Sequence, residues 1–147
     1  MNYSYGREVN QVLQELPNVS AVVITSWLDN MSQFDPNESI MIPSVQSVIQ
    51  ACHNQGIPCI VISAGLPYDL SCYEEADALL AVYNPLGASY DETGRILPGY
   101  APNLAAAIDI LFGYAKPSGT LPVNVPKVEG TGLSEEIAYP RGSGLIW

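Results

Sequence analysis

The chain has 147 residues, of which 48% are hydrophobic and only 14% are charged, and its formal net charge is −10 at pH 7. This length suits one domain that buries a sizeable core. The charge argues against nucleic acid and anionic membrane surfaces as partners, because basic patches bind such partners. No apolar run approaches the roughly 18 residues of a membrane span.

The first half of the chain alternates helix patterns with short apolar runs. Apolar residues spaced by three and four positions predict helices over 9–16 and 45–52. The β-branched runs Ala21–Ile24 and Cys59–Ile62 predict strands that are buried on both faces. The polar loop Trp27–Met41 separates the first strand from the second helix.

The second half continues this alternation and then loses it. Ser71–Glu74 has the pattern of a capping box, so a helical turn is expected to begin there. The run Ala78–Tyr83 predicts a third strand, the long loop Asn84–Tyr100 follows, and an apolar stripe predicts a helix over 104–112. Leu121–Pro126 contains two prolines and is expected to be an edge strand or a surface strap. The Gly-rich tail after it is expected to be irregular.

Strands that alternate with helices predict an α/β fold in which a mostly parallel sheet lies between two layers of helices. This is a three-layer sandwich of the flavodoxin or Rossmann kind, formed by residues 1–147 as one domain. A helix of such a fold normally follows a strand, whereas the first predicted element here is a helix. We therefore expect the domain to be excised from a larger protein and to lack an edge strand.

Polar residues follow the strands at the end where open α/β sheets bind their ligands. The loops Trp27–Met41, Leu66–Ser71 and Asn84–Tyr100 each follow a parallel strand, so we expect all three at one edge of the sheet. Trp27, Asp29 and Asp69 are the candidate residues for a ligand-binding rim there, because an aromatic face and carboxylates suit a sugar. The alternative for Asp69 is a turn residue that caps backbone amides.

Several kinds of chemistry lack their motifs in this sequence. Ser63 follows a strand as a nucleophile elbow would, but Val61 stands where that motif has glycine, and the single histidine, His53, lies within a predicted helix. No glycine-rich phosphate loop and no zinc-type spacing occurs. We therefore expect neither a cofactor nor a metal.

Three cysteines, at positions 52, 59 and 72, cannot all pair. Two of them fall on predicted apolar surfaces, so buried free thiols are expected. The odd number of cysteines and the lack of a secretory pattern favour a cytoplasmic location.

Four stretches taken together resemble the C-terminal α/β sandwich domain of family-three glycoside hydrolases. They are Ile60–Leu70 (IVISAGLPYDL), Ala76–Tyr83 (ADALLAVY), Ala105–Gly113 (AAAIDILFG) and Pro117–Val123 (PSGTLPV). The closing Tyr139–Leu145 is similar to the family's terminal Tyr-Pro-aromatic-Gly-x-Gly-Leu, with Arg141 in place of the aromatic residue. The similarity runs from about Val19 to Leu145, in order and at family-like spacing.

The resemblance implies that the catalytic centre lies elsewhere in the parent enzyme. The form Pro67–Leu70 looks like the β-N-acetylhexosaminidase branch, in which the catalytic residues belong to an N-terminal β/α barrel. In the β-glucosidase branch the loop that corresponds to Trp27–Met41 supplies the acid/base glutamate. Glu38 is the candidate here, but it lies closer to Ile42 than the family's acid/base would, so no catalytic residue is assigned.

The function that follows is an accessory domain of a retaining exo-glycosidase, which stabilises the barrel and shapes the rim of the active site around a carbohydrate substrate. The competing hypothesis is a free-standing flavodoxin-like domain that binds a small ligand or a protein. A barrel encoded upstream of the chain would distinguish the two.

We expect the chain by itself to self-associate, because an open sheet edge and a surface meant for another domain favour pairing. Repulsion from the net charge of −10 opposes this, but it is screened beyond about 8 Å at physiological salt. Sedimentation over a range of concentrations in about 0.15 M salt measures the outcome. A 15.8 kDa species at every concentration would show that repulsion prevails.

Overall fold

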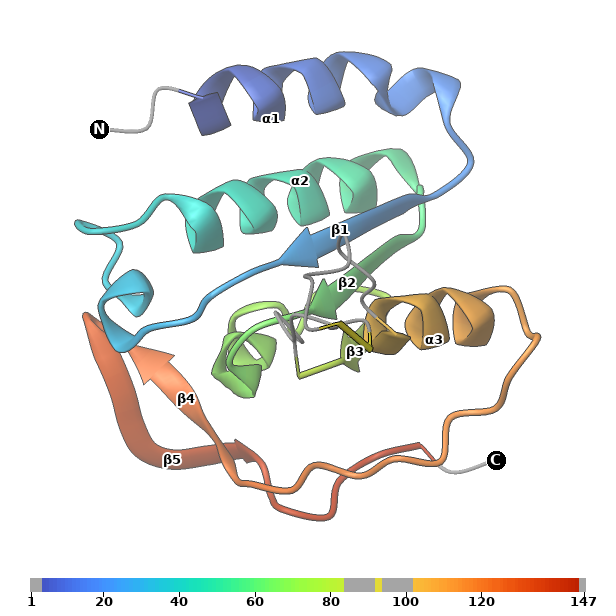
Figure 1. The fold of residues 1–147 in the computed structure, drawn as a ribbon. Helices are drawn as coiled ribbons and strands as arrows, with labels where there is room; N and C mark the ends of the chain where they lie inside the picture. The colour runs from blue at the N-terminus through green and yellow to red at the C-terminus, as the bar shows by residue number, and fades with distance from the viewer. Residues whose placement is uncertain (1–3, 84–91, 94–101, 146–147) are drawn as a thin grey trace.

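The computed structural model describes residues 4–83, 92–93 and 102–145 of the chain. Its central sheet has three parallel strands in the order β1 (Val22–Ser26), β2 (Cys59–Ser63) and β3 (Ala78–Ala81). Helices α1 (Ser4–Glu15) and α2 (Met41–Gln55) lie on one side of this sheet, and α3 (Pro102–Leu111) lies on the other (Figure 1). The expected three-layer α/β sandwich is therefore confirmed.

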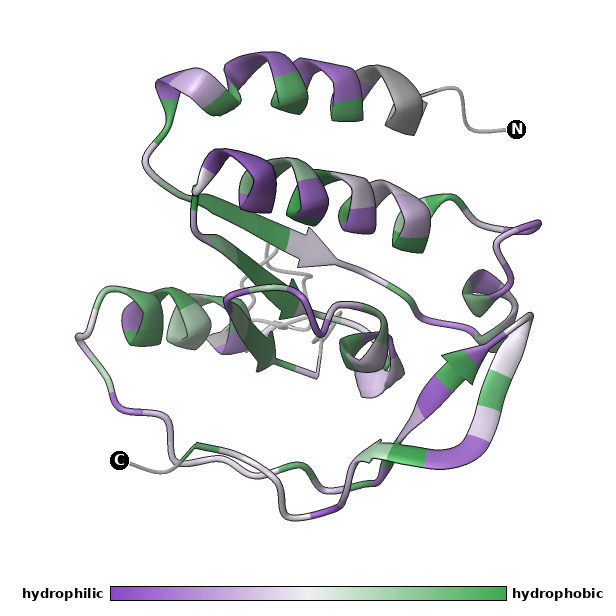
Figure 2. Cartoon of the chain, turned by 180° about the vertical axis from the view of Figure 1, so that it is seen from behind, coloured by the Kyte–Doolittle hydropathy of each residue, from purple (hydrophilic) through white to green (hydrophobic). Residues whose placement is uncertain are grey.

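The two faces of β2 divide the core into two clusters. Val61 faces α2 and packs with its apolar stripe, whereas Ile62 faces α3 and packs around Ala107. Both strand residues are at most 1% exposed, as expected of a central parallel strand with helices on both sides. Hydrophobic colour covers β2 and the first part of β1, whose arrowhead is pale (Figure 2). At the sheet edge, by contrast, Val23 on β1 is 49% exposed.

The capping box expected at Ser71–Glu74 is wrong, because the helical turn ends there instead of beginning. A 3₁₀ helix, η3 (Pro67–Cys72), occupies the preceding segment. Pro67 stands near its start, where a preset φ angle and a missing N–H are no disadvantage. The Ser71 hydroxyl donates to the Tyr68 carbonyl inside this turn at 2.9 Å.

The irregular tail is also a wrong expectation. Strands β4 (Val125–Glu129) and β5 (Gly132–Tyr139) form an antiparallel hairpin, and the expected extended segment Leu121–Pro126 contributes only its last two residues to it. The register shifts on both sides of Pro126, which is how a strand accommodates a residue without an N–H. One side of this two-stranded ribbon is exposed, so its sequence lacks the apolar run of a buried strand.

The hairpin covers the end of the sheet toward which the parallel strands point. It lies beside η3 and beside the short helix η2 (Met31–Phe34), which follow β2 and β1 respectively (Figure 1). Val125 at the start of β4 is completely buried, and Val128 and Leu133 pack against the main core cluster. The C-terminal segment thus closes the carboxyl edge of the sheet from one side.

Beyond their paired strands, β1 and β2 continue side by side. The Ala64 N–H donates to the Ser26 carbonyl at 2.8 Å, and the Leu66 N–H donates to the Leu28 carbonyl at 2.6 Å. Gly65 lies between these two bonds, and a Cβ atom there would clash with the Leu28 carbonyl oxygen. Only glycine permits this approach of one backbone to the other.

Gly65→Ala is expected to destabilise the fold by about 2–4 kcal/mol, because the clash is with backbone that cannot move aside as a side chain would. Gly119→Ala is the matched control, since a Cβ at Gly119 meets nothing within 4 Å. Denaturant unfolding of both variants measures the effect. Equal midpoints for the two variants would contradict the importance of this contact.

Candidate functional site

The carboxyl ends of β1 and β2 meet at a buried polar cluster. Ser26 ends β1, Ser63 ends β2, and the register of the two strands places these serines opposite each other. The loops Trp27–Met41 and Leu66–Ser71 leave from this point, so they lie at one edge of the sheet as expected. The third expected loop, Asn84–Tyr100, lies almost wholly outside the described residues.

Asp69 on η3 is the centre of this cluster. Its carboxylate accepts a hydrogen bond from the Ser26 hydroxyl at 2.6 Å and another from the Ser63 hydroxyl at 2.5 Å. The Tyr73 hydroxyl lies 3.0 Å from the Ser26 hydroxyl. Because Ser26 gives its proton to the carboxylate, Tyr73 is the donor to Ser26. Each of the four residues is at most 1% exposed.

Burial of the Asp69 side chain raises its pKa to about 6, because removal from water disfavours the charged form. The two serine hydroxyls and the backbone amides of Asp69 and Leu70 lower the pKa and so limit this rise. These amides are the turn contacts that the sequence offered as the alternative role of Asp69. No other carboxylate contributes to the shift. The geometry is that of a structural anchor, which ties η3 to the ends of two strands.

The other candidate rim residues lie on the loop that leaves β1. Trp27 is half-buried and packs against the cluster on the α3 side of the sheet. Asp29 is exposed, its backbone N–H donates to the Gln33 side chain at 2.7 Å, and its carboxylate accepts from Asn30 at 3.1 Å. The structure therefore keeps Trp27 and Asp29 adjacent at the edge and separates Asp69 from them by burying it.

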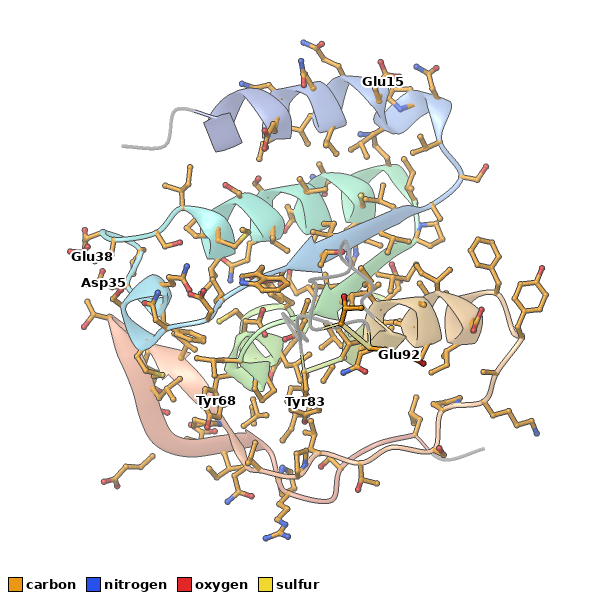
Figure 3. The ribbon with its side chains drawn as sticks, viewed as in Figure 1. Glu15, Asp35, Glu38, Tyr68, Tyr83 and Glu92 are labelled. Atoms are coloured by element: carbon orange, nitrogen blue, oxygen red, sulfur yellow. The ribbon has the colours of Figure 1, made fainter. Side chains whose placement is uncertain are left out.

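Glu38 lies farther along the same loop and is exposed. Its backbone N–H donates to the Asp35 carbonyl at 3.0 Å, in a turn that Asp35 also fixes by accepting from the Asn37 backbone at 2.8 Å. Glu38 and Asp35 lie together at the outer end of the molecule, away from Tyr68 on η3 (Figure 3). Glu38 is thus exposed, whereas Asp69, the neighbour of Tyr68, is buried.

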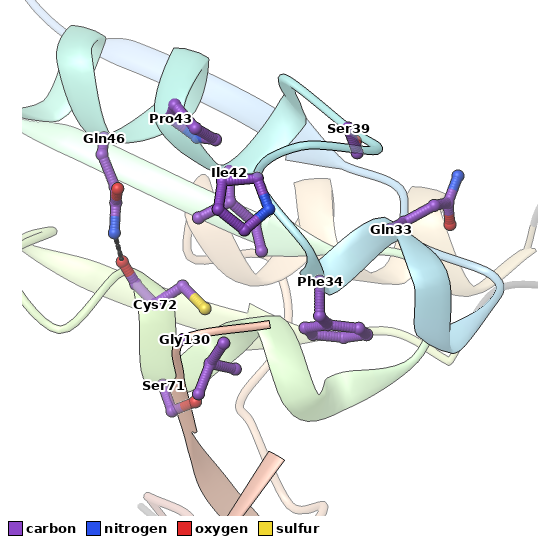
Figure 4. A pocket seen from close by; sticks show the side chains of 11 residues that line it. Gln33, Phe34, Ser39, Ile42, Pro43, Gln46, Ser71, Cys72 and Gly130 are labelled. Carbon is purple, nitrogen blue, oxygen red and sulfur yellow. Dashed lines mark hydrogen bonds between the residues drawn. The ribbon is translucent and has the colours of Figure 1, made fainter. Parts of the chain in front are cut away.

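A hollow of about 240 Å³ lies between η2, the start of α2, η3 and the turn of the hairpin (Figure 4). Its polar side chains already serve the fold. Gln46 donates to the Cys72 carbonyl at 2.9 Å, and Gln33 caps η2 by accepting from the Asn30 backbone at 3.2 Å. The hollow is smaller than the roughly 300–1,000 Å³ of a usual ligand pocket. It carries no group that is free to fix a ligand's orientation.

The three thiols are unpaired in the structure. Cys52 on α2 and Cys59 on β2 contact each other in the core, and burial raises the pKa of Cys59 to about 12. Neither thiol is therefore a nucleophile near neutral pH. Within the part of the chain that the structure describes, no three acidic, histidine or cysteine side chains are arranged to hold a metal ion, and no helix could cross a membrane.

Sequence reasoning overlooked Ser26, Ser63 and Tyr73 as partners of Asp69. A signal did exist for the serines, since Ser26 follows the predicted strand Ala21–Ile24 after one residue and Ser63 follows the predicted strand Cys59–Ile62 directly. Polar residues at the same end of two neighbouring parallel strands indicate a shared partner beyond the sheet.

Replacing Asp69 by asparagine is expected to change how stability depends on pH. The folded protein holds the Asp69 proton more tightly than the unfolded chain does. The protonated Asp69 therefore stabilises the fold fully below about pH 4, and this stabilisation is lost as the pH rises through about 6. Relative to Asp69→Asn, the wild-type chain should lose on the order of 3 kcal/mol across this window.

Urea unfolding between about pH 4 and pH 7 measures this difference. Asp29→Asn removes an exposed carboxylate and serves as the control for the change in net charge. Parallel stability curves for the wild-type chain and Asp69→Asn would contradict the raised pKa.

The comparison with known families agrees with this architecture. The family model described as the glycosyl hydrolase family 3 C-terminal domain matches residues 6–146. No curated protein matches the chain. The match covers nearly the whole sequence, including both faces of the sheet, the anchor around Asp69 and the C-terminal hairpin. The chain therefore belongs to the family of glycosyl hydrolase family 3 C-terminal domains.

Proposed function

We propose that the chain serves a retaining exo-glycosidase whose catalytic residues lie on an N-terminal β/α barrel. Family membership makes it an accessory domain of a glycoside hydrolase that associates with the N-terminal domain of its parent enzyme. We extend that statement in three respects: the reaction is retaining, the enzyme acts at chain ends, and the catalytic domain is a β/α barrel. The proposal favours an accessory role over a free-standing flavodoxin-like domain.

The observation that carries this proposal is the internal engagement of Asp69. A retaining glycosidase needs two carboxyl groups about 5–5.5 Å apart, one as nucleophile and one as acid/base. Asp69 is completely buried and already bonded to two serines, so it cannot face a glycosidic bond. Glu38 is exposed, and Figure 3 shows it away from Tyr68, the neighbour of Asp69 on η3. A catalytic pair supplied by another domain is the arrangement that fits.

The contribution of this chain would be the rim of the active site. Trp27 can offer an aromatic face to the apolar side of a sugar ring, and the exposed Asp29 carboxylate can accept from its hydroxyl groups. Asp69 would support this rim from beneath, because it fixes the end of β1, from which Trp27 and Asp29 follow.

Between the two enzyme types, we favour the β-N-acetylhexosaminidase type over the β-glucosidase type. Support comes from the segment Pro67–Leu70, whose sequence looks like that branch, and from the position of Glu38. Pro67 and Leu70 are buried, so this segment also serves to pack η3 against the sheet. The coding sequence upstream of the chain would test the proposal directly by showing whether a barrel precedes it.

The isolated chain is expected not to hydrolyse para-nitrophenyl N-acetyl-β-glucosaminide or para-nitrophenyl β-glucoside above a buffer blank, because retaining hydrolysis needs two carboxyl groups and Glu38 is the single candidate proposed in this chain. Release of para-nitrophenol measures the activity. Turnover that disappears in Glu38→Gln and persists in Glu135→Gln, an exposed glutamate on β5, would overturn the prediction and favour the β-glucosidase type.

A further inference from the structure

Tyr83 combines two unfavourable features at the carboxyl end of the third strand. Its φ angle is 45°, in the left-handed region that residues other than glycine rarely adopt. Its hydroxyl oxygen is buried and has no hydrogen-bond partner. Each feature costs free energy on its own. Their coincidence at one residue calls for an explanation beyond the fold.

The strain at Tyr83 is not that of a loose strand end. The Val82 N–H donates to the Ser63 carbonyl at 2.9 Å, which continues the pairing of β3 with β2. The Asn103 side chain, on α3, donates to the Val82 carbonyl at 2.8 Å and to the Tyr83 carbonyl at 3.3 Å. Sheet and helix together hold this backbone in place. Strain that the surroundings enforce in this way is typical of functional positions.

Aromatic residues follow all three parallel strands at this edge. Tyr68 on η3 follows β2, and its phenol is close enough to Tyr83 to contribute to raising the Tyr83 pKa. Trp27 follows β1 and packs in the cluster that contains Val82, the neighbour of Tyr83. Figure 3 shows Tyr68 and Tyr83 on the same side of the molecule. Tyr83 is thus linked to the loop of the proposed rim and to η3.

We propose that Tyr83 is a substrate-positioning residue whose hydroxyl is kept for an alcohol group of the sugar that binds at this edge. This inference rests on the proposed function and extends it to a named residue. A neutral phenol both donates and accepts a hydrogen bond, as a sugar hydroxyl does. Burial keeps the phenol neutral, since it raises the Tyr83 pKa above its usual value.

The strained backbone supplies the movement that binding needs. The hydroxyl oxygen is covered in the free chain, so a sugar reaches it only after the ring turns. Return of φ to the ordinary negative region would relieve the strain and reorient the side chain, and it would give up the longer bond from Asn103 to the Tyr83 carbonyl, at 3.3 Å. A ligand that gives the hydroxyl its partner therefore favours the relaxed conformation.

The first test is unfolding of the isolated chain with Tyr83→Phe, which removes only the hydroxyl. The variant should unfold at the same denaturant midpoint as the wild-type chain or at a higher one, because a buried unpaired group is removed. Tyr114→Phe is the matched control, because Tyr114 is 82% exposed at the end of α3. A lower midpoint for Tyr83→Phe alone would reveal a partner within the chain and overturn the proposal.

The second test uses the full-length parent enzyme with the same two chromogenic sugars. Tyr83→Phe should raise KM about threefold to tenfold, as expected for one lost hydrogen bond, and leave kcat within about twofold. Tyr114→Phe should change neither constant. An unchanged KM overturns the inference. The unfolding midpoint of the parent enzyme then shows the reason, because a lowered midpoint would mean that the Tyr83 hydroxyl binds the barrel instead of the sugar.

Different kinetic results would contradict the proposed function and the role of Tyr83. A wild-type parent enzyme that hydrolyses neither sugar would contradict the proposed substrate types, and this inference would fall with them. A wild-type enzyme that is active, with Tyr83→Phe kinetically identical to it, would contradict only the role of Tyr83.

Discussion

Burial of the Asp69 carboxylate is the constraint on which the carboxyl edge of this domain depends. A carboxylate removed from water is costly unless hydrogen bonds replace its hydration. Two serine hydroxyls, one from the end of each central strand, provide that replacement. The arrangement forces η3 to pack directly over the strand ends. Beside it, the backbones after β1 and β2 run so close together that only glycine fits at position 65.

The hairpin β4–β5 covers part of this edge. It packs on η3 and η2, so the C-terminal segment covers the region beneath the buried cluster. The loop after β1 keeps its first residues at the edge, with Trp27 half-buried and Asp29 exposed. Trp27 and Asp29 thus lie over a hydrogen-bonded interior. This arrangement suits the proposed role, in which the domain shapes the rim of an active site and another domain supplies the catalytic residues.

This organisation separates two roles that the sequence could not distinguish. Asp29 and Asp69 are both acidic residues that closely follow a parallel strand, and both were candidates for the rim. Asp69 turns inward because η3 places it opposite two serines, whereas Asp29 follows the buried Leu28 and points to solvent. Which residue becomes an anchor depends on partners 43 and 6 residues away along the chain.

The α/β class, the three parallel strands, the buried stripe of α2 and the family could all be predicted from the sequence, because apolar periodicity and ordered motifs are local signals. The hairpin formed by the tail could not be predicted in this way, since β5 depends on packing on η2 and on pairing with β4 more than on its own pattern. Nor could the burial of Asp69 and the unpaired hydroxyl of Tyr83 be predicted. Those properties depend on the presence or absence of a hydrogen-bond partner in three dimensions, which local patterns in the sequence do not specify.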